Sequence, residues 1–223
     1  MRKTPIGDSA IQLHTADIVT DEAVLAARAL ADQISRSCPP FVRDVVAVYV
    51  DITVYFDASE REAAVAWLEN ALASAAFPTD STSIEPSTHS IPVCHRESFA
   101  PDLQAIANRV GRSSGDLIEL FASRVYTVGA IGFLPGFAYL LGLDASLHSP
   151  RLAEPRPRVR AGSVGIGGSQ TGIYPSESPG GWNIIGRTPM PMFDATRTPS
   201  ARLRCGDRVR FKPITSSEFD RWK

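Results

Sequence analysis

The feature that most constrains this sequence is the distribution of its glycines. Half of them, 8 of 16, fall between positions 162 and 186. Glycine and proline interrupt helices and favour turns, and from residue 125 onward the apolar stretches between them are short. These stretches are Val125–Ile131, Val159–Ile166, Trp182–Ile185 and Arg208–Phe211. Short apolar strands separated by turn residues predict an antiparallel barrel or sandwich for this half of the chain.

The first half alternates helical and strand patterns instead. Thr20 precedes two acidic residues and apolar residues at helical spacing, which predicts a capped amphipathic helix. Its expected buried face is Val24, Ala27, Leu30, Ala31 and Ile34. Residues 46–56 alternate apolar and polar side chains, which predicts one strand with a single buried face. Ser59 to Glu62 has the pattern of a capping box ahead of a second helix. The apolar face expected for that helix is Ala63, Ala66, Trp67 and Leu72.

A change in composition divides the chain. Between Phe77 and Ser90 proline, serine and threonine replace most apolar residues, which is typical of a linker. We therefore expect a domain boundary near residue 90, with one domain over 1–90 and another over 91–223. Two short helices are predicted just after it, over Pro101–Val110 and Ser114–Ser123, and Gly111 is expected to close the first.

The charged residues exclude several classes of function. There are 23 basic and 24 acidic residues, so the chain has no electrostatic footprint for nucleic acid or an anionic membrane. Lysine occurs only at Lys3, Lys212 and Lys223, which excludes a Schiff-base or P-loop lysine in the middle of the chain. A phosphate or carboxylate would therefore be held by arginine, by backbone N–H groups or by residues of a partner.

Compartment and metal content follow from weaker signals. The three cysteines are isolated, which supports neither a disulfide framework nor a zinc site, and no metal is expected. The N-terminus lacks the apolar core of a signal peptide, so we expect a cytoplasmic protein. Residues 125–143 carry no charge and are long enough to span a membrane, but their four glycines and Pro135 favour a buried strand and a turn.

The glycine-rich segment also carries the candidate binding residues. Gln170, Thr171 and Asn183 offer uncharged donors and acceptors, and Arg187 offers a cation beside backbone that glycine leaves open to a ligand. Tyr174 and Trp182 would add flat walls. Composition alone is equally consistent with tight barrel turns. Neither a Walker A motif nor a dinucleotide-binding glycine motif is present.

The remaining charged residues give weaker candidates. His14 and His89 lie in polar segments and are expected to be inert, whereas His95 and His148 lie near the motifs described next. Arg151, Arg156, Arg158 and Arg160 form a basic cluster that fits a solvated surface, or else anion steering or a subunit contact.

Three contiguous segments identify a family. They are residues 133–140 (FLPGFAYL), 162–175 (GSVGIGGSQTGIYP) and 178–189 (SPGGWNIIGRTP), followed by Phe193-Asp194. They closely resemble the family of 5-oxoprolinase B subunits, which includes the kinase inhibitor KipI and is also called allophanate hydrolase subunit 1. The resemblance implies an α+β ferredoxin-like N-terminal domain followed by an all-β cyclophilin-like barrel.

The resemblance also implies a function. Such proteins pair with a second cyclophilin-like-barrel protein, the C subunit of 5-oxoprolinase. The A subunit completes an ATP-dependent complex that opens 5-oxoproline to L-glutamate, with ATP and Mg²⁺ as co-substrate and no tightly bound cofactor. The alternatives are inhibition of a sensor histidine kinase and a role in urea or allophanate metabolism.

The same resemblance, together with the residue types, gives the candidate site. The expected substrate or ATP contacts are Gln170, Thr171, Tyr174, Gly180, Gly181, Trp182, Asn183 and Arg187. Because few ionisable groups accompany them, we expect the partner to supply the missing charges at an interface beside residues 162–187.

Overall fold

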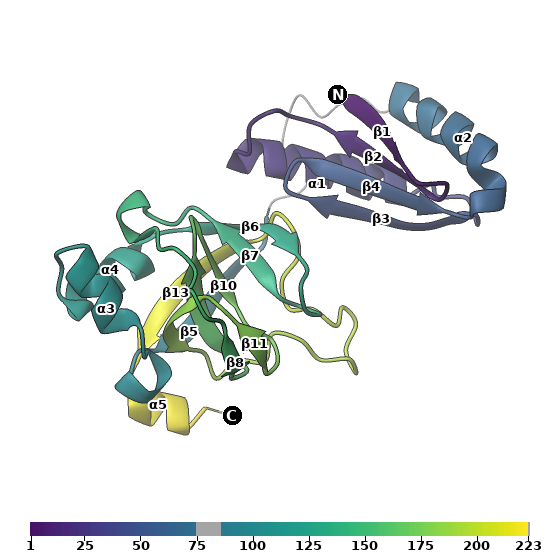
Figure 1. Ribbon diagram of the computed structural model, residues 1–223. Helices are drawn as coiled ribbons and strands as arrows, with labels where there is room; N and C mark the ends of the chain where they lie inside the picture. Colours follow the sequence, from purple (N-terminus) through teal and green to yellow (C-terminus); the bar gives the residue numbers. More distant parts are fainter. Residues whose placement is uncertain (75–85, 223) are drawn as a thin grey trace. The chain divides into compact units, whose positions relative to one another are not determined.

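The protein divides into two compact units, described here from a computed structural model (Figure 1). The structure describes residues 1–74 and 86–222. The units are Met1–Pro86 and Ser87–Lys223. Strand β5 (Thr88–Cys94) pairs along its whole length with a strand of the second unit, so the boundary expected near residue 90 lies a few residues earlier in the structure. Most of the predicted linker lies outside the described residues.

The first unit is an antiparallel sheet with two helices. Its elements are β1 (Arg2–Ile6), β2 (Ala10–His14), α1 (Asp21–Ser35), β3 (Val42–Val48), β4 (Asp51–Phe56) and α2 (Arg61–Ser74). The strands lie in the order β1-β2-β4-β3. The α+β character agrees with the sequence. The chain order is ββαββα, however, whereas a ferredoxin-like domain runs βαββαβ, and here the N-terminal strand β1 occupies the edge beside β2.

Helix α1 forms as its sequence predicts. The Thr20 side chain accepts a hydrogen bond from the Ala23 backbone N–H (3.2 Å), and the acidic residues of the first turn favour the positive end of the helix dipole. All five residues of its predicted face are buried. Four of the five, Ala27, Leu30, Ala31 and Ile34, pack with Leu13, Ile52 and residues of α2 in one apolar cluster on a single face of the sheet.

Two other predictions for this unit were wrong. Residues 46–56 form the end of β3, a two-residue turn and β4, because Tyr49 takes a positive φ of 54° that reverses the chain. The turn residues, Tyr49 and Val50, are both apolar, so the pattern of alternating side chains gives no sign of a turn. The expected capping box at Ser59 to Glu62 is replaced by a short 3-10 helix, Ala58–Glu60, that leads into α2.

The buried face of α2 also differs from its prediction. Ala64, Leu68 and Leu72 are buried, four residues apart, and Trp67 packs partly against them. Ala63 and Ala66 are exposed. The buried face of the helix therefore begins at Ala64, one residue later than the predicted face, which began at Ala63.

The second unit is built on a closed seven-stranded barrel, one of the two architectures, barrel or sandwich, that the glycine-rich sequence predicts. The strands are β5, β6 (Tyr126–Ile131), β7 (Ala138–Leu141), β9 (Ser163–Gly167), β10 (Gln170–Ile173), β12 (Asn183–Arg187) and β13 (Arg208–Ile214). They close in the order β10-β7-β6-β13-β5-β12-β9. The architecture is consistent with a cyclophilin-like barrel. It is not wholly antiparallel, because β5 and β13 run parallel.

Smaller elements flank the barrel. The helices are α3 (Leu103–Arg109), α4 (Ser114–Ser123) and α5 (Ser216–Asp220), and β8 (Arg156–Val159) pairs with β11 (Ser178–Gly180) in a separate ribbon. Helix α4 matches its prediction and has a capping box between Ser113 and Asp116. Gly111 closes α3 with a φ of 66°, also as predicted. Phe121 of α4 stacks on Phe211 of β13, which joins this helix to the barrel core.

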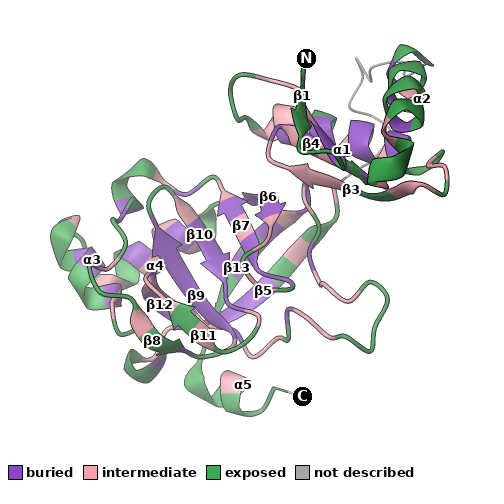
Figure 2. Cartoon of the chain, turned by 45° about the vertical axis from the view of Figure 1, so that its right-hand side comes forward, coloured by how far each residue is buried: buried purple, intermediate pink, exposed green. Residues whose placement is uncertain are grey.

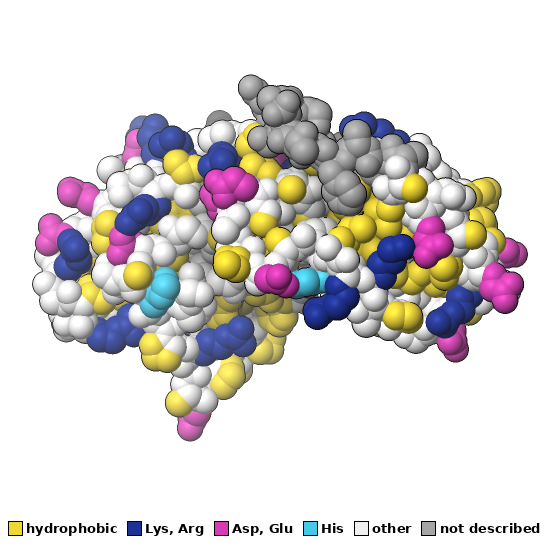
Figure 3. Space-filling model, turned by 90° about the horizontal axis from the view of Figure 1, so that it is seen from above, with side chains coloured by type: hydrophobic (Ala, Val, Ile, Leu, Met, Phe, Trp, Pro, Cys, Tyr) yellow, Lys and Arg dark blue, Asp and Glu magenta, His cyan; other side chains and the backbone are white. Residues whose placement is uncertain are grey.

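The predicted strand over residues 159–166 is interrupted. β8 ends at Val159, and β9 begins only at Ser163, because Gly162 turns the chain with a φ of 82°. The uncharged stretch over 125–143 forms β6 and β7. Among the described residues no helix is long and apolar enough to cross a membrane. On the face seen in Figure 3, basic and acidic side chains are interspersed, in keeping with the balanced charge.

Candidate functional site

The most distinctive cavity of the barrel unit lies between the barrel wall and the β8–β11 ribbon. It encloses about 270 Å³. Its lining residues are Phe133, Phe137, Tyr139, Arg151, Leu152, Pro155, Tyr174, Pro179, Gly180, Gly181 and Trp182. We call it the aromatic cavity, since five of these side chains are aromatic.

Strand parity explains why aromatic side chains gather outside the barrel. Val164, Ile166 and Ile173 point into the barrel core. The alternate positions on β9 and β10 therefore face outward, and glycines occupy three of the five, at Gly165, Gly167 and Gly172. Trp182, Phe137 and Tyr174 form a second apolar cluster with Val159 and Ile184. Strand β9 is consequently buried on both faces, as its colour in Figure 2 shows.

The outward glycines leave room for this layer. A Cβ atom on Gly167 would lie 2.5 Å from the Trp182 indole. One on Gly172 would lie 2.7 Å from the Ala138 carbonyl oxygen and 3.1 Å from the rings of Phe137 and Trp182. These glycines therefore serve close packing of rings on the sheet, a role that the sequence analysis did not separate from ligand approach.

The aromatic rings pack edge to face around the cavity. The centre of the Phe137 ring lies 5.2 Å from that of Tyr174 and 5.5 Å from that of Trp182. Both of these rings are nearly perpendicular to the Phe137 ring. Tyr139 lies 5.8 Å from Trp182. Such arrangements stabilise pairs of rings beyond the area they bury and hold the walls in place.

Phe133 stands at the edge of this cluster in an unusual conformation. Its φ is 68°, which is rare for a bulky side chain, and 61% of the residue is exposed. Its ring contacts Phe137 edge to face at 5.5 Å. An exposed phenylalanine held in a strained backbone beside a cavity is typical of a functional site. The sequence marked this residue only as part of a family motif.

Arg151 is the single charged side chain among the residues that line the aromatic cavity. Two of its three neighbours in the basic cluster are engaged elsewhere. Arg156 donates to Asp102 at 2.6 Å, and Arg158 donates to Glu177 at 2.6 Å. The cavity therefore combines apolar walls with one cation.

The two tyrosines supply the remaining polar side chains. Burial raises the pKa of the Tyr174 hydroxyl, although a backbone hydrogen bond from Trp182 and the nearby Arg151 and Arg156 oppose the shift. The Tyr174 hydroxyl is thus neutral at physiological pH and acts as a hydrogen-bonding group, not as a base. No carboxylate, histidine, cysteine or lysine is among the described residues that line the cavity, and these side chains suit it to binding and orienting a ligand.

The structure brings together half of the eight residues predicted for the site. Tyr174, Gly180, Gly181 and Trp182 line the aromatic cavity. Gln170, Thr171, Asn183 and Arg187 do not. Thr171 is fully buried, and its hydroxyl donates to the Gly165 carbonyl oxygen at 2.9 Å. The Asn183 amide donates to the carbonyl oxygens of Pro150 and Ile166 at 2.8 and 3.2 Å. These two polar groups hold loops and strands together.

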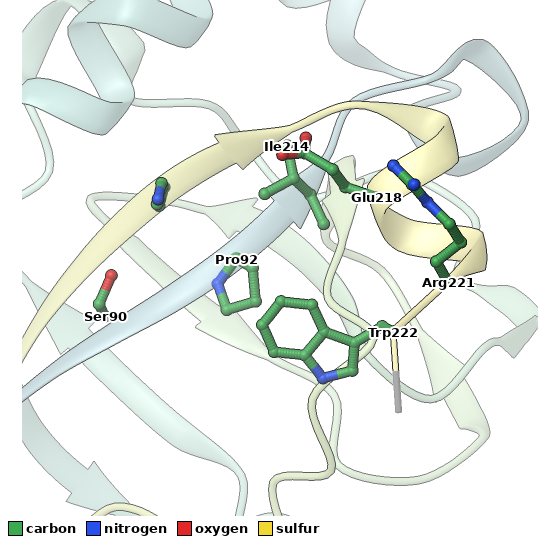
Figure 4. Close-up of a pocket in the computed structure, with 7 residues that line it drawn as sticks. Ser90, Pro92, Ile214, Glu218, Arg221 and Trp222 are labelled. Atoms are coloured by element: carbon green, nitrogen blue, oxygen red, sulfur yellow. The ribbon is translucent and has the colours of Figure 1, made fainter.

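Arg187 lines a different cavity, described below. A third hollow, of about 730 Å³, lies over the outer surface of β5 and β13 (Figure 4). Trp222 and Pro92 face it, together with Glu218 and Arg221. Glu218 is already bound to Thr215 in the capping box of α5, and Arg221 donates to the Ser217 carbonyl oxygen. Glu218 and Arg221 thus stabilise α5, whereas the other polar lining residues, Ser90 and Lys212, lie on β5 and β13.

The histidines and metal ligands take no part in the aromatic cavity. His148 is exposed, and its carbonyl oxygen accepts a hydrogen bond from Arg109 at 3.0 Å. His95 packs beside Gly186, and its Nδ1 lies 2.7 Å from the Ile185 carbonyl oxygen. Within residues 1–74 and 86–222, no three His, Cys, Asp or Glu side chains are grouped so that they could hold a metal ion.

We expect His95 to make the stability of the barrel unit depend on pH. Burial lowers the pKa of His95 despite its hydrogen bond to Ile185. The unfolded state therefore binds the proton first, so the stability due to His95 is complete above about pH 6.5 and decreases as the pH falls below it. His95→Asn keeps a donor for Ile185 but cannot be protonated. In chemical denaturation, the stability difference between wild type and His95→Asn should narrow as the pH falls. A difference that stays constant would contradict this role.

Comparison with known proteins supports one family. Residues 1–203 match the family described as carboxyltransferase domain, subdomain C and D. The chain is 31% identical to a protein from Bacillus subtilis named as the B subunit of 5-oxoprolinase, over 98% of this chain and 95% of the relative. A protein of the same name from Escherichia coli O157:H7 is 48% identical over 60% of this chain and 62% of its own length.

Solved structures agree with this result. The crystal structure of TTHA0988 superposes with a TM-score of 0.80 at 34% identity. The match covers 92% of this chain and 40% of that longer chain. The urea amidolyase of K. lactis superposes with a TM-score of 0.72 at 19% identity over 98% of this chain and 15% of that enzyme, which shows a shared fold.

Proposed function

This chain belongs to the carboxyltransferase-domain family, subdomains C and D, together with proteins named as B subunits of 5-oxoprolinase, and we propose that it is the B subunit of an ATP-dependent 5-oxoprolinase. In this proposal the complex opens the lactam ring of 5-oxoproline to L-glutamate with hydrolysis of ATP. The A and C subunits of that enzyme are the proposed partners, and we expect activity only from the complex of all three.

The observation that carries the proposal is the pairing of aromatic walls with one arginine in the aromatic cavity. 5-Oxoproline is a small, nearly flat lactam that bears a carboxylate. Its ring fits between Tyr139, Tyr174 and Trp182, and Arg151 can bind its carboxylate through a guanidinium fork. The Tyr139 hydroxyl can bind the lactam amide, and the Tyr174 hydroxyl, which accepts a backbone hydrogen bond from Trp182, can still donate its own hydrogen.

The chemistry explains why this cavity is not sufficient for catalysis. A lactam is a resonance-stabilised amide and a poor electrophile. Transfer of the γ-phosphoryl group of ATP to the lactam oxygen would give an activated imidate. Water then attacks the carbon, and the ring C–N bond breaks to leave a free amine and an acyl phosphate. A second water attacks the acyl carbon, and phosphate leaves with the lactam oxygen. Such a transfer depends on positioning and charge stabilisation. The aromatic cavity can position the lactam, whereas the phosphate-binding cations and the base must come from other surfaces or from the partner proteins.

Reconstitution tests this division of roles. The purified chain alone should show no 5-oxoproline-dependent ATP hydrolysis, and activity should appear when the A and C subunits are added. Turnover by the isolated chain would overturn the multi-subunit proposal. The same complex tested with urea and allophanate, and the chain tested against a sensor histidine kinase, separate the two alternative functions.

Arg151→Gln should lower kcat/KM of the assembled complex for 5-oxoproline by roughly 10²–10³, since it removes a charged contact to the substrate. The matched control is Arg158→Gln, which removes the same charge from an exposed pair with Glu177 and should retain near-full activity. Equal activity of the two variants would place the substrate carboxylate elsewhere.

A further inference from the structure

A second cavity of the barrel unit lies on the far side of the Tyr174–Pro175 segment from the aromatic cavity, because Tyr174 lines one cavity and Pro175 the other. It encloses about 400 Å³. Its lining residues are Ala161, Gly162, Pro175, Arg187, Thr188, Pro189, Met190, Pro191, Phe219 and Trp222. We call it the proline-lined cavity. Arg187 is its single charged lining residue.

The fold holds the Arg187 guanidinium in a fixed orientation. Its Nε donates to the Ala161 carbonyl oxygen at 2.8 Å. The guanidinium carbon lies 5.3 Å from the centre of the Phe99 ring and 5.9 Å from that of Phe219. Within the described residues, its two terminal nitrogens have no hydrogen-bond or ion-pair partner. An arginine fixed through Nε and its flat face leaves the outer edge of its fork available to a ligand.

The surroundings of Arg187 carry an excess of positive charge. Burial lowers the pKa of Arg187, and repulsion from the nearby Arg160 and Arg96 lowers it further. Arg96 is compensated by Asp220 at 3.1 Å. Arg160 is exposed next to the lining residue Ala161 and has no acidic partner in the part of the chain that the structure describes. Two arginines therefore remain uncompensated beside one cavity.

We propose that the proline-lined cavity binds a phosphoryl group, held by the terminal nitrogens of Arg187 with Arg160 contributing from the rim. The guanidinium fork matches phosphate oxygens in geometry. A phosphate dianion neutralises both uncompensated arginines, whereas a carboxylate neutralises one. This site is separate from the aromatic cavity and does not depend on the identity of the substrate bound there.

The test is calorimetric titration of the full chain with inorganic phosphate and, separately, with ATP. Both should bind saturably. Arg187→Gln should weaken binding by roughly 10- to 100-fold, the effect of losing hydrogen bonds to a charged group. Arg187→Lys should restore part of the loss, because it keeps the charge without the fork. Equal affinities for the two probes would identify free phosphate as the ligand, and tighter binding of ATP would identify the phosphoryl end of a nucleotide.

Two further variants serve as a control and as an independent test of the proposal. Arg112→Gln removes an equal charge from an exposed turn of the same unit and should leave phosphate binding unchanged. Among the described residues the Arg160 side chain has no hydrogen-bond or ion-pair partner, so Arg160→Gln should leave the fold intact. It should weaken binding by a smaller factor than Arg187→Gln, and it tests the proposal even if Arg187→Gln does not fold. The proposal is overturned if neither probe binds in the millimolar range, if Arg160→Gln and Arg187→Gln bind as wild type does, or if Arg112→Gln loses as much as Arg187→Gln.

Discussion

Replacing Gly162 with alanine is expected to destabilise the barrel unit by about 2–5 kcal/mol. Gly162 has a φ of 82°, and the left-handed conformation costs a non-glycine residue about 1–2 kcal/mol. An added Cβ would also overlap the Thr188 carbonyl oxygen, which is backbone and cannot rotate away. Overpacking of this kind costs about 1–3 kcal/mol. Any shift would strain the Gly162 N–H bond to the Tyr174 carbonyl oxygen, at 2.7 Å.

Gly168 provides the matched control for this prediction. It has a φ of 65°, but nothing lies within 4 Å of the position of an added Cβ. Gly168→Ala should therefore cost only the conformational part, about 1–2 kcal/mol. Urea denaturation of both variants measures the difference. Equal losses would mean that the chain around Thr188 moves freely, and that the wall between the two cavities is less rigid than the structure indicates.

Replacing Trp182 with alanine is expected to have the second large effect. The residue is only 5% exposed, and its indole packs on Gly167, Phe137 and Tyr139. Removing a buried aromatic side chain of this size costs about 3–5 kcal/mol. The substitution also removes one wall of the aromatic cavity, so affinity for a flat ligand should fall together with stability. Trp182→Phe, which keeps an aromatic ring, should retain most of both.

A double-mutant cycle tests whether Gly167 exists to accommodate that ring. In the wild-type background, Gly167→Ala places a methyl group 2.5 Å from the indole and should be destabilising. In the Trp182→Ala background the obstacle is gone, and the same substitution should be nearly neutral. The coupling free energy should therefore be of the order of 1–3 kcal/mol, measured from the four unfolding free energies. Additive effects would show that Gly167 serves some other purpose.

Local patterns predicted the helices that depend on near neighbours in the chain. The Thr20 cap and the five-residue face of α1 were both correct, and so were the bounds of α4. The wrong predictions concern segments whose conformation is set by contacts with distant residues and not by the local sequence pattern. The apolar turn at Tyr49 has no turn signal in its composition, and its positive φ is tolerated because the two flanking strands pair with each other.

The candidate site shows the same contrast between what local patterns predict and what tertiary contacts decide. The sequence pattern indicates the segment that contains Tyr174, Trp182 and Arg187, but predicts a single site there. The two cavities separate because adjacent residues of an extended chain face opposite directions, which sends Tyr174 to one cavity and Pro175 to the other. Thr171 and Asn183 resembled ligand contacts, but their polar groups satisfy backbone atoms of the barrel.

The sequence by itself determined the two-part organisation, an all-β second part of barrel or sandwich type, the family and the shortage of ionisable groups near the glycines. These properties follow from composition, period and contiguous motifs, which need no knowledge of distant contacts. Only the tertiary structure decided that Gly167 and Gly172 lie under aromatic rings and that Arg187 and Trp182 line different cavities. Those outcomes depend on strand register and on barrel closure, in which β5 pairs with β13 from the far end of the sequence. A shift of one residue in register would turn every side chain to the opposite face, so no local pattern could have settled them.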